Sequence, residues 1–322
     1  MINETMLLTC PACAWEFEGA SDETISYPCD ESLDACPQEI RFCQQCGLGV
    51  AYPLLSDEQL EKLYQKGQYW QDSETKILTA REYPGRCAVA QAQWKFISIY
   101  LNNQGNKKEI SVLDVGAGQG FLGMAAAKDK QLRLERYCAV EADPYLRGSL
   151  IKTWEKSFSY VRFEASESVS TLEGTFDVVI LSHIIEHLPD PKMFLKEVVG
   201  RLNPDGVLFV DVPYQDYRFK SNVFPHLLFF NEENLRKLFK AVGLRAEVVE
   251  RFGKDGAKAF INSKGTSPKE KLIVRIVYKL RKWLPASFSV WFFDRHLGAS
   301  FRNPQGIWIR ALAKRSEGRK SL

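Results

Sequence analysis

The chain has 322 residues, a formal net charge of +3 and an apolar content of 45%, values typical of a soluble protein with a substantial core. This length suggests about two domains. No apolar run approaches the roughly 18 residues that a membrane-spanning helix needs, and the first residues lack the basic segment of a secretory signal. We therefore exclude an integral membrane protein and expect a cytoplasmic one.

Basic residues are concentrated toward the carboxyl-terminal end. Residues 251–322 carry 17 Lys/Arg against 4 Asp/Glu, so the preceding residues carry a net charge of about −10. Such an asymmetry indicates an anionic partner, either a membrane surface or a nucleic acid. The alternative is a basic face that meets only solvent.

Two Cys-x-x-Cys pairs stand near the start of the chain: Cys10 with Cys13, and Cys43 with Cys46. Each pair fits on a tight turn that presents two thiolates to one ion, and two such turns complete a tetrahedral zinc site. A site with no open coordination position stabilises folding and does not catalyse. Redox-active or unliganded cysteines are the alternatives. Cys29 and Cys36 lie between the pairs and either replace ligands or stand apart; a disulfide is not expected in a chain without an export signal.

The stretch from Ile110 to Gly120 combines a predicted buried strand with a glycine-rich turn. Its apolar, β-branched residues end at Asp114, and glycines follow at alternate positions. A turn without Cβ atoms lets a ligand lie against the backbone, and a helix beginning at Phe121 would direct free N–H groups toward that ligand. A nicotinamide or flavin fingerprint needs glycine where Phe121 stands, and a phosphate-binding loop needs a Gly-Lys-Ser/Thr that does not follow.

This Gly-x-Gly-x-Gly turn after an acidic residue resembles the first motif of class I S-adenosylmethionine (SAM) methyltransferases. The resemblance implies a Rossmann-like α/β fold with SAM as the cofactor. A second buried strand ends at Glu141, whose carboxylate can accept hydrogen bonds from both ribose hydroxyls of a nucleoside. The family would place adenine after the third predicted strand, 160–163, and the methyl group beside the end of the fourth, 175–182. The expected cofactor residues are Asp114, Gly116, Ala117, Gly118, Gly120, Phe121, Glu141, Ala165, Ser166 and Ser182.

Residues 55–109 are expected to form a helical linker or cap, with one helix over 86–103. The order of a cysteine ribbon, a helix and the aromatic pair Tyr69-Trp70 resembles the front end of bacterial methyltransferases of surface-polysaccharide and small-molecule biosynthesis. In related enzymes an aromatic residue of this segment often closes over SAM. Tyr69 is therefore a candidate for that contact, and core packing is its alternative role.

Two of the four histidines follow the fourth predicted strand, in His183-Ile-Ile-Glu186-His187. This block resembles the Glu-His segment of class I methyltransferases. Positions 183, 186 and 187 share one face of a helical turn, and a third histidine, His226, precedes another predicted helix. Because a histidine with a near-neutral pKa can take a proton from a hydroxyl, we expect His183 or His187 to be a general base aided by Glu186, with His226 in the same cluster.

Two alternatives remain for this cluster. Methyltransferases with Glu-x-x-Glu-His and a distant histidine bind a divalent ion that holds substrate hydroxyls, but His183 stands where they have their first glutamate, and imidazole suits zinc, iron or nickel better than magnesium. A purely structural role is the second alternative. The similar metalloprotease pattern is excluded because the block follows a strand of a nucleotide-binding sheet.

The last two predicted strands, 245–251 and 307–313, enclose an insertion at about 254–304. Residues 268–284 form a predicted amphipathic helix with Ile273, Ile276, Val277, Leu280 and Leu284 on one face and basic residues on the other. Residues 268–297 could therefore contact an anionic membrane, at the inner membrane face of the cell. The alternative is a helix that packs on the core and exposes only its basic face.

Together these patterns predict a Rossmann-like, seven-stranded methyltransferase sheet with a small N-terminal zinc ribbon and a C-terminal helical insertion. We expect the ribbon at 1–54 and the SAM-dependent methyltransferase domain at 110–322. The predicted reaction is methyl transfer to a hydroxyl of a sugar, glycan precursor or related small metabolite, with zinc as a structural ion. The alternatives are an rRNA or tRNA methyltransferase whose ribbon binds RNA, and a non-catalytic SAM-binding regulator.

Overall fold

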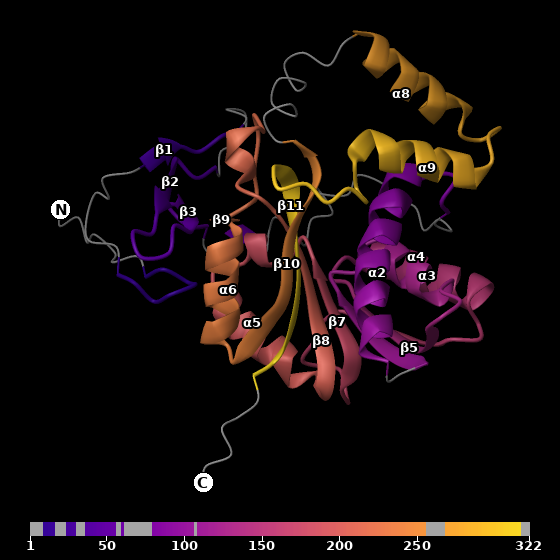
Figure 1. The fold of residues 1–322 in the computed structure, drawn as a ribbon, viewed down its shortest axis with the longest axis horizontal. Coiled ribbons are helices and arrows are strands. Elements are labelled where there is room, and N and C mark those ends of the chain that lie inside the picture. The colour runs from indigo at the N-terminus through magenta and orange to yellow at the C-terminus, as the bar shows by residue number, and fades with distance from the viewer. Residues whose placement is uncertain are drawn as a thin grey trace.

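A seven-stranded sheet forms the centre of the protein. The structure, a computed structural model, describes residues 9–16, 24–29, 36–55, 59–60, 79–105, 108–255 and 268–316. The strand order is β10-β11-β8-β7-β4-β5-β6 (Figure 1). These strands are β4 (Glu109–Val115), β5 (Arg133–Val140), β6 (Arg162–Ser166), β7 (Phe176–Ser182), β8 (Leu202–Pro213), β10 (Leu244–Asp255) and β11 (Gly306–Arg315). β4, β5, β6, β7 and β8 pair in parallel, whereas β11 runs antiparallel to both β8 and β10. The predicted Rossmann-like, seven-stranded sheet is confirmed, and the structure shows that its last strand in the chain, β11, is reversed.

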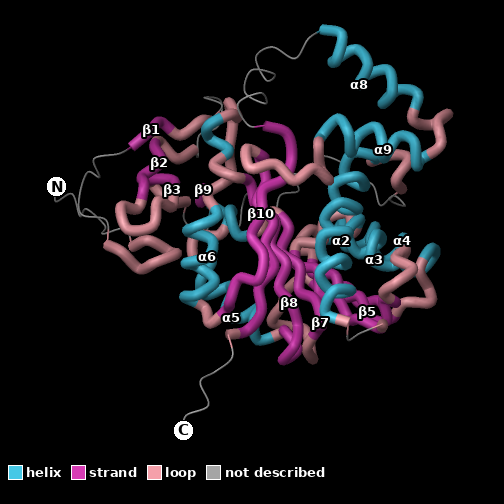
Figure 2. Tube along the Cα trace, viewed as in Figure 1, coloured by secondary structure: helices cyan, strands magenta, loops and turns pink. Residues whose placement is uncertain are grey.

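Helices cover both faces of this sheet because its central strands are apolar at nearly every position. Alternate side chains of a strand point to opposite faces, so Val178 and Ile180 of β7 join one apolar cluster and Val179 and Leu181 join the other. The first face carries α2 (Pro84–Gln104), α3 (Phe121–Ala127) and α4 (Pro144–Ser157), and the second carries α5 (Pro191–Gly200) and α6 (Glu232–Ala241), as Figure 2 shows.

A second, four-stranded sheet joins the cysteine-bearing segment to the central core. Its strands, in order, are β1 (Thr24–Ser26), β2 (Glu39–Phe42), β3 (Gly49–Tyr52) and β9 (Leu228–Phe229). The first three belong to the ribbon, the name used here for the described residues between 9 and 55, whereas β9 follows β8 in the chain. Val50, Leu228 and Phe229 are buried in the apolar cluster that also holds strands of the central sheet. The ribbon is therefore continuous with the core.

The insertion contributes α8 (Pro268–Leu280) and α9 (Ala286–Leu297) between β10 and β11. β10 ends at Asp255, which pairs with Gly306 at the start of β11. The insertion thus leaves the sheet at the edge where the parallel strands have their carboxyl ends. Figure 1 shows both helices beyond this edge, with α9 against the start of α2. Among the described helices, none is both long enough and apolar enough to span a bilayer.

Residues 202–206 include Asn, Pro, Asp and Gly, a composition typical of a turn. In the structure they belong to β8, whose pairing with β7 shifts register between Phe176 and Val178. An irregularity of this kind accommodates extra residues in one strand without ending the ladder.

Candidate active site

The glycine-rich turn lies between the end of β4 and the start of α3. Gly116, Gly118 and Gly120 have φ angles of 69°, 54° and 69°, in the left-handed region that residues with a Cβ rarely adopt. The N–H groups of Gly116 and Ala117 donate to the carbonyl of Val140 at 2.8 and 2.9 Å. These bonds hold the turn against the end of β5.

Two of these glycines differ in what surrounds them. A Cβ on Gly116 would lie 2.1 Å from Cδ1 of Ile184, so this glycine permits close contact with the segment that carries His183. A Cβ on Gly118 would meet no atom of the described residues within 4 Å. The turn therefore packs tightly at its start and leaves space for a ligand over its middle.

Glu141 follows β5 directly, and its carboxylate lies at the same turn. Oε2 accepts a hydrogen bond from the N–H of Gly118 at 2.7 Å, and Oε1 accepts one from the N–H of Asp143 at 3.0 Å. Burial raises the pKa of this carboxyl, although both N–H groups counteract the effect. Glu141 thus places two acceptor oxygens beside the space over Gly118.

Asp114 and Phe121 stand at the two ends of the glycine turn, and both are buried. The carboxylate of Asp114 is buried and accepts a hydrogen bond from the hydroxyl of Tyr137 at 2.8 Å. Burial raises the pKa of Asp114 to about 7, although the bond from Tyr137 opposes this. Phe121 is buried at the start of α3, with its ring 5.9 Å from that of Tyr83. Both side chains therefore belong to the buried packing at the ends of the turn.

The remaining predicted cofactor residues lie at the carboxyl ends of neighbouring strands. Ser166, preceded by Ala165, ends β6, and its carbonyl accepts a hydrogen bond from the N–H of Glu141 at 2.9 Å. Ser182 ends β7, and its hydroxyl accepts one from Nε2 of Gln93 at 2.8 Å. These residues therefore share one edge of the sheet with the glycine turn. Tyr69 lies outside the described residues.

His183 turns back over the end of β7 and is held by Glu186. Its φ of 57° is left-handed, a conformation that costs a non-glycine residue about 1 kcal/mol or more. This geometry brings Nδ1 of His183 to 3.1 Å from Oε1 of Glu186, which belongs to the short 3-10 helix η1 (Ile185–His187). The His183 side chain is 37% exposed and that of Glu186 only 1%. An accessible imidazole is thus oriented by a buried carboxylate.

His187 and His226 extend this cluster inward. Their rings are 4.8 Å apart in an edge-on arrangement, and Nε2 of His187 is 4.0 Å from Oε1 of Glu186. Nδ1 of His226 lies 3.0 Å from Oδ2 of Asp216, which also pairs with Lys220 at 2.7 Å. One ligand atom from each of Glu186, His187 and His226 lies within 4.8 Å of the others. All four predicted residues of the cluster are therefore brought together.

The electrostatic environment shifts the pKa values of His183 and His187 in opposite directions. Burial lowers the pKa of His183, but the hydrogen bond and charge of Glu186 outweigh it, so the net shift is upward. Burial lowers the pKa of His187 to about 4 despite the attraction of Glu186. Burial alone would raise the pKa of Asp216, but His226 and Lys220 bring it down to about 2. His183 is consequently the better proton acceptor of the pair at neutral pH.

A buried polar network that the sequence analysis did not identify supports this edge. Oδ2 of Asp211 accepts hydrogen bonds from Nε of Arg310 and Nε2 of Gln93, both at 2.9 Å, and its backbone carbonyl accepts one from the N–H of His183 at 2.8 Å. Asp211 and Arg310 are fully buried. A charged residue in the middle of each of two apolar strands is the signal that could have indicated them.

Arg86 is another residue near the glycine turn that the sequence did not indicate. It lies in the first turn of α2, and its Nη1 donates to Oε1 of Gln119 in the glycine turn at 3.0 Å. This contact holds a guanidinium group at the rim of the turn.

The four predicted zinc ligands converge in the ribbon. The Sγ atoms of Cys10 and Cys46, and those of Cys13 and Cys43, are each 3.5 Å apart, and all four sulfurs lie within 4.8 Å of one another. A tetrahedral zinc ion with Zn–S bonds of about 2.3 Å needs sulfurs about 3.8 Å apart. The arrangement fits such an ion.

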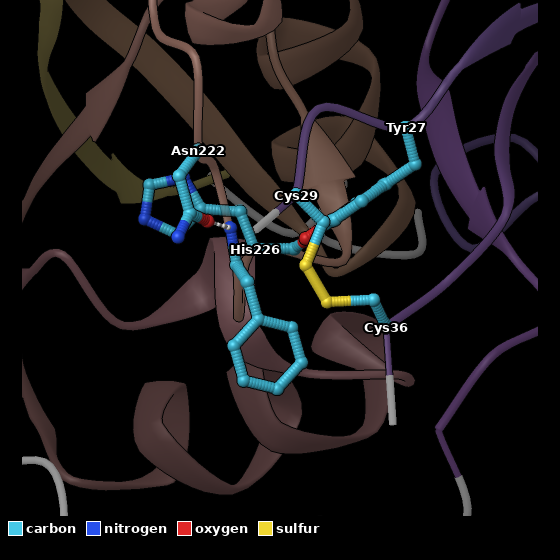
Figure 3. Close-up of a disulfide and its surroundings, with 6 residues drawn as sticks. Tyr27, Cys29, Cys36, Asn222 and His226 are labelled. Carbon is cyan, nitrogen blue, oxygen red and sulfur yellow. Dashed lines mark hydrogen bonds between the residues drawn. A yellow bond between two sulfur atoms is a disulfide. The ribbon is translucent and has the colours of Figure 1, made fainter. Parts of the chain in front are cut away.

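The remaining ribbon cysteines contradict the expectation that no disulfide forms. Cys29 and Cys36 are bonded to each other, so neither replaces a zinc ligand. They are seven residues apart in the sequence, so the disulfide joins two neighbouring segments of the ribbon. Figure 3 shows this disulfide beside the loop that carries Asn222 and His226.

Backbone contacts attach the ribbon to that loop. The N–H of Val223 donates to the carbonyl of Pro28 at 2.9 Å, and the N–H of Ala51 donates to the carbonyl of Leu227 at 2.8 Å. Together with the β3–β9 pairing, they fix the chain on both sides of His226.

Comparisons with known proteins identify the central part of the chain. A family model described as a methyltransferase domain matches residues 89–249, which is half of the chain. This stretch begins in α2 and ends in β10, so it includes the glycine turn and the histidine cluster.

Curated relatives match over shorter stretches. The mitochondrial ubiquinone biosynthesis O-methyltransferase of Saccharomyces cerevisiae is 29% identical over 127 residues, which cover 35% of this chain and 37% of that protein. C-methyltransferase NovU of Streptomyces niveus is 34% identical over 87 residues, which cover 26% of this chain and 21% of that protein. The matched part is thus well under two thirds of either relative. Among solved structures, coclaurine N-methyltransferase bound to N-methylheliamine and SAH is 16% identical with a TM-score of 0.41, covering 69% of this chain and 72% of that chain.

Proposed function

Because this chain belongs to the methyltransferase-domain family, we propose that it is a SAM-dependent methyltransferase that methylates a hydroxyl of a sugar, glycan precursor or related small metabolite. The observation that carries the proposal is the pair formed by His183 and Glu186. An accessible imidazole, oriented by a buried carboxylate, lies at the same sheet edge as the glycine turn.

The residues around the turn fit SAM. No described residue fills the space over Gly118, and the two oxygens of Glu141 beside it can accept hydrogen bonds from ribose hydroxyls. Ala165 and Ser166 would line the adenine. When bound, SAM supplies an electrophilic methyl group on its sulfonium, so the protein has only to align an acceptor and remove one proton.

His183 is the proposed general base. With its Nδ1–H donated to Glu186, its Nε2 has a lone pair available to the acceptor hydroxyl. Nε2 of His183 would take the proton of the acceptor hydroxyl while SAM supplies the methyl group. Base catalysis of this kind contributes about a hundredfold or more to the rate.

The proposed base supports an oxygen acceptor, whereas the relatives differ in the atom that they are named for methylating. Ubiquinone biosynthesis O-methyltransferase is named for transfer to oxygen and NovU for transfer to carbon. A hydroxyl needs one proton removed by a base of near-neutral pKa, and the pKa of His183 is shifted upward from its ordinary value. We therefore favour oxygen.

A structural zinc ion in the ribbon is part of the proposal. The four sulfurs of Cys10, Cys13, Cys43 and Cys46 would fill its coordination sphere, which leaves no position for a substrate. Its function would be to fold the ribbon, and the ribbon in turn supports the loop that carries His226.

The test combines cofactor binding with transfer of a labelled methyl group. Extract from the source cells is incubated with methyl-labelled SAM and the pure protein, then separated into RNA, lipid, glycan and small-molecule pools. We expect label in the glycan or small-molecule pool. His183→Asn should reduce transfer about a hundredfold while the SAM Kd from calorimetry stays unchanged, whereas Glu141→Ala should weaken SAM binding.

Other outcomes would contradict the proposal in distinct ways. Label in the RNA pool would indicate an RNA methyltransferase. Tight SAM binding without transfer to any pool would indicate a regulator. If His183→Asn transferred methyl at the wild-type rate, His183 would not be the base, although the chain would still be a methyltransferase.

A further inference from the structure

The insertion exposes an unusual density of large apolar side chains. In α8, Leu272, Ile273, Ile276 and Leu280 are 57%, 51%, 45% and 46% exposed, and Trp283 in the following turn is 86% exposed. With 3.6 residues per helical turn, the four aliphatic residues fall on one continuous side of α8. Packing within the chain does not account for the aliphatic side chains on the outward side of this helix.

The opposite side of α8 is already used for packing. Val274 and Val277 are partly buried against the apolar cluster on the first face of the sheet, and the ring of Tyr278 meets that of Phe293 in α9 at 6.5 Å. The backbone carbonyl of Lys282 also accepts a hydrogen bond from Arg81 at 3.0 Å. The helix is therefore attached through one side, and the exposed aliphatic side is a second, separate surface.

Cations border this aliphatic surface. Arg275, Lys279 and Lys282 are exposed and occupy neighbouring positions around the helix, and residues 272–291 contain no Asp or Glu. On their other side, away from the aliphatic surface, Arg275 and Lys279 border a groove of about 390 Å³ whose lining also includes Val274 and Tyr278. The surface thus presents positive charge next to hydrocarbon.

Exposed aromatic side chains are also present on α9, the second helix of the insertion. Phe288 and Trp291 are 42% and 54% exposed, with their rings 5.8 Å apart. Tryptophan is enriched where a protein meets the headgroup region of a bilayer, because its ring is apolar and its N–H is polar.

We propose that the exposed side of α8, with Trp283 and Trp291, is a peripheral docking surface for a phospholipid bilayer that carries anionic headgroups. The aliphatic and aromatic side chains enter the boundary between headgroups and acyl chains, and the three exposed cations meet the headgroups. Nucleic acid is disfavoured because its phosphates would attract the cations but leave the adjoining aliphatic side chains exposed. Because the insertion leaves the sheet at the carboxyl ends of the parallel strands, docking holds the active-site edge toward the membrane side.

Co-sedimentation of the full-length protein with vesicles tests this surface. The vesicles are pure phosphatidylcholine or an equimolar mixture with phosphatidylglycerol. We expect binding to the mixed vesicles that weakens with added salt, and at least tenfold weaker binding to phosphatidylcholine. On the mixed vesicles, Arg275→Gln/Lys279→Gln/Lys282→Gln should lose about fivefold per charge removed, and Ile273→Gln/Ile276→Gln should lose at least tenfold.

The matched control is Met193→Gln/Lys196→Gln on α5, where a methionine that is 70% exposed and an exposed lysine receive the same changes. This variant should bind the mixed vesicles like the wild type, and thermal unfolding should show that all variants are folded. Equal binding to both vesicle types, or equal loss in the α5 control, would overturn the proposal. It would also be overturned if the α8 variants bound the vesicles normally and instead lost RNA binding or a dimer seen by size-exclusion chromatography.

Discussion

The hydroxyl of Tyr27 donates a hydrogen bond of 2.8 Å to the backbone carbonyl of His226, across a separation of 199 residues. Tyr27 follows β1 of the ribbon, and His226 faces Asp216 in the candidate active site. The bond is buried, so no water competes for it, and a lost donor would leave the carbonyl without this partner. Through this contact, the ribbon helps to fix the position of His226 in the candidate active site.

Tyr27→Phe should therefore affect the acceptor site more than the cofactor site. We expect the free energy of unfolding to fall by about 1 kcal/mol and the KM for the acceptor to rise, while the Kd for SAM stays the same. Tyr160→Phe is a matched control, because the Tyr160 hydroxyl also donates to a backbone carbonyl, that of Ala127 at 3.0 Å, but is exposed. If both variants had equal kinetics, Tyr27 would have no positioning role.

The pH dependence of methyl transfer should report His183. A base must be neutral to accept a proton, so the rate should rise with pH as His183 loses its proton. Because Glu186 raises the pKa of His183, the inflection should lie above the ordinary histidine value of about 6.5. Glu186→Gln removes that charge, so the inflection should move to lower pH, and the maximal rate should fall as the ring loses its orientation.

His187 provides the control for this profile. Its pKa is lowered to about 4 by burial, so it is already neutral across the range of the expected inflection. His187→Asn should keep the inflection at its wild-type pH, whatever its effect on the maximal rate. An inflection that vanished in His187→Asn but persisted in His183→Asn would assign the base to His187.

Metal analysis should separate the ribbon from the histidine cluster. We expect one zinc per chain, and its loss in Cys46→Ser together with reduced stability, since the free energy of binding a structural zinc is also free energy of folding. His226→Asn should retain that zinc. A second equivalent of metal that is lost only in His226→Asn would instead support a metal held by Glu186, His187 and His226.

Site residues that belong to a local sequence motif could be predicted from the sequence. Site residues that reach the site only through tertiary contacts could not. The spacing of Gly116, Gly118 and Gly120 predicts a turn at a strand end, and the structure places them there. Asp216 and Gln93 reach the site through tertiary contacts with His226 and Ser182. No periodicity or motif marks such contacts. The pairing of β3 with β9 joins segments far apart in the chain, so the attachment of the ribbon to the active-site loop was also outside what spacing can indicate.

The buried pair of Asp211 and Arg310 gives the sharpest prediction about stability. Nε of Arg310 lies 2.9 Å from Oδ2 of Asp211, and both side chains are fully buried. The guanidinium also lies 4.5 Å from the ring centroid of Phe252. Removing one partner leaves an uncompensated charge in the core, so Asp211→Ala should lower the free energy of unfolding by about 3–5 kcal/mol.

Replacing both partners with apolar residues should cost less than removing Asp211 alone. In Asp211→Val/Arg310→Met no charge is left to desolvate, so urea unfolding should show a double variant more stable than Asp211→Ala. If the loss of stability in the double variant equalled the sum of the losses in the two single variants, Asp211 and Arg310 would not be coupled. The stable double variant should still methylate poorly, because Gln93 loses one of its acceptors and the strand end that carries Ser182 and His183 loses the network beneath it.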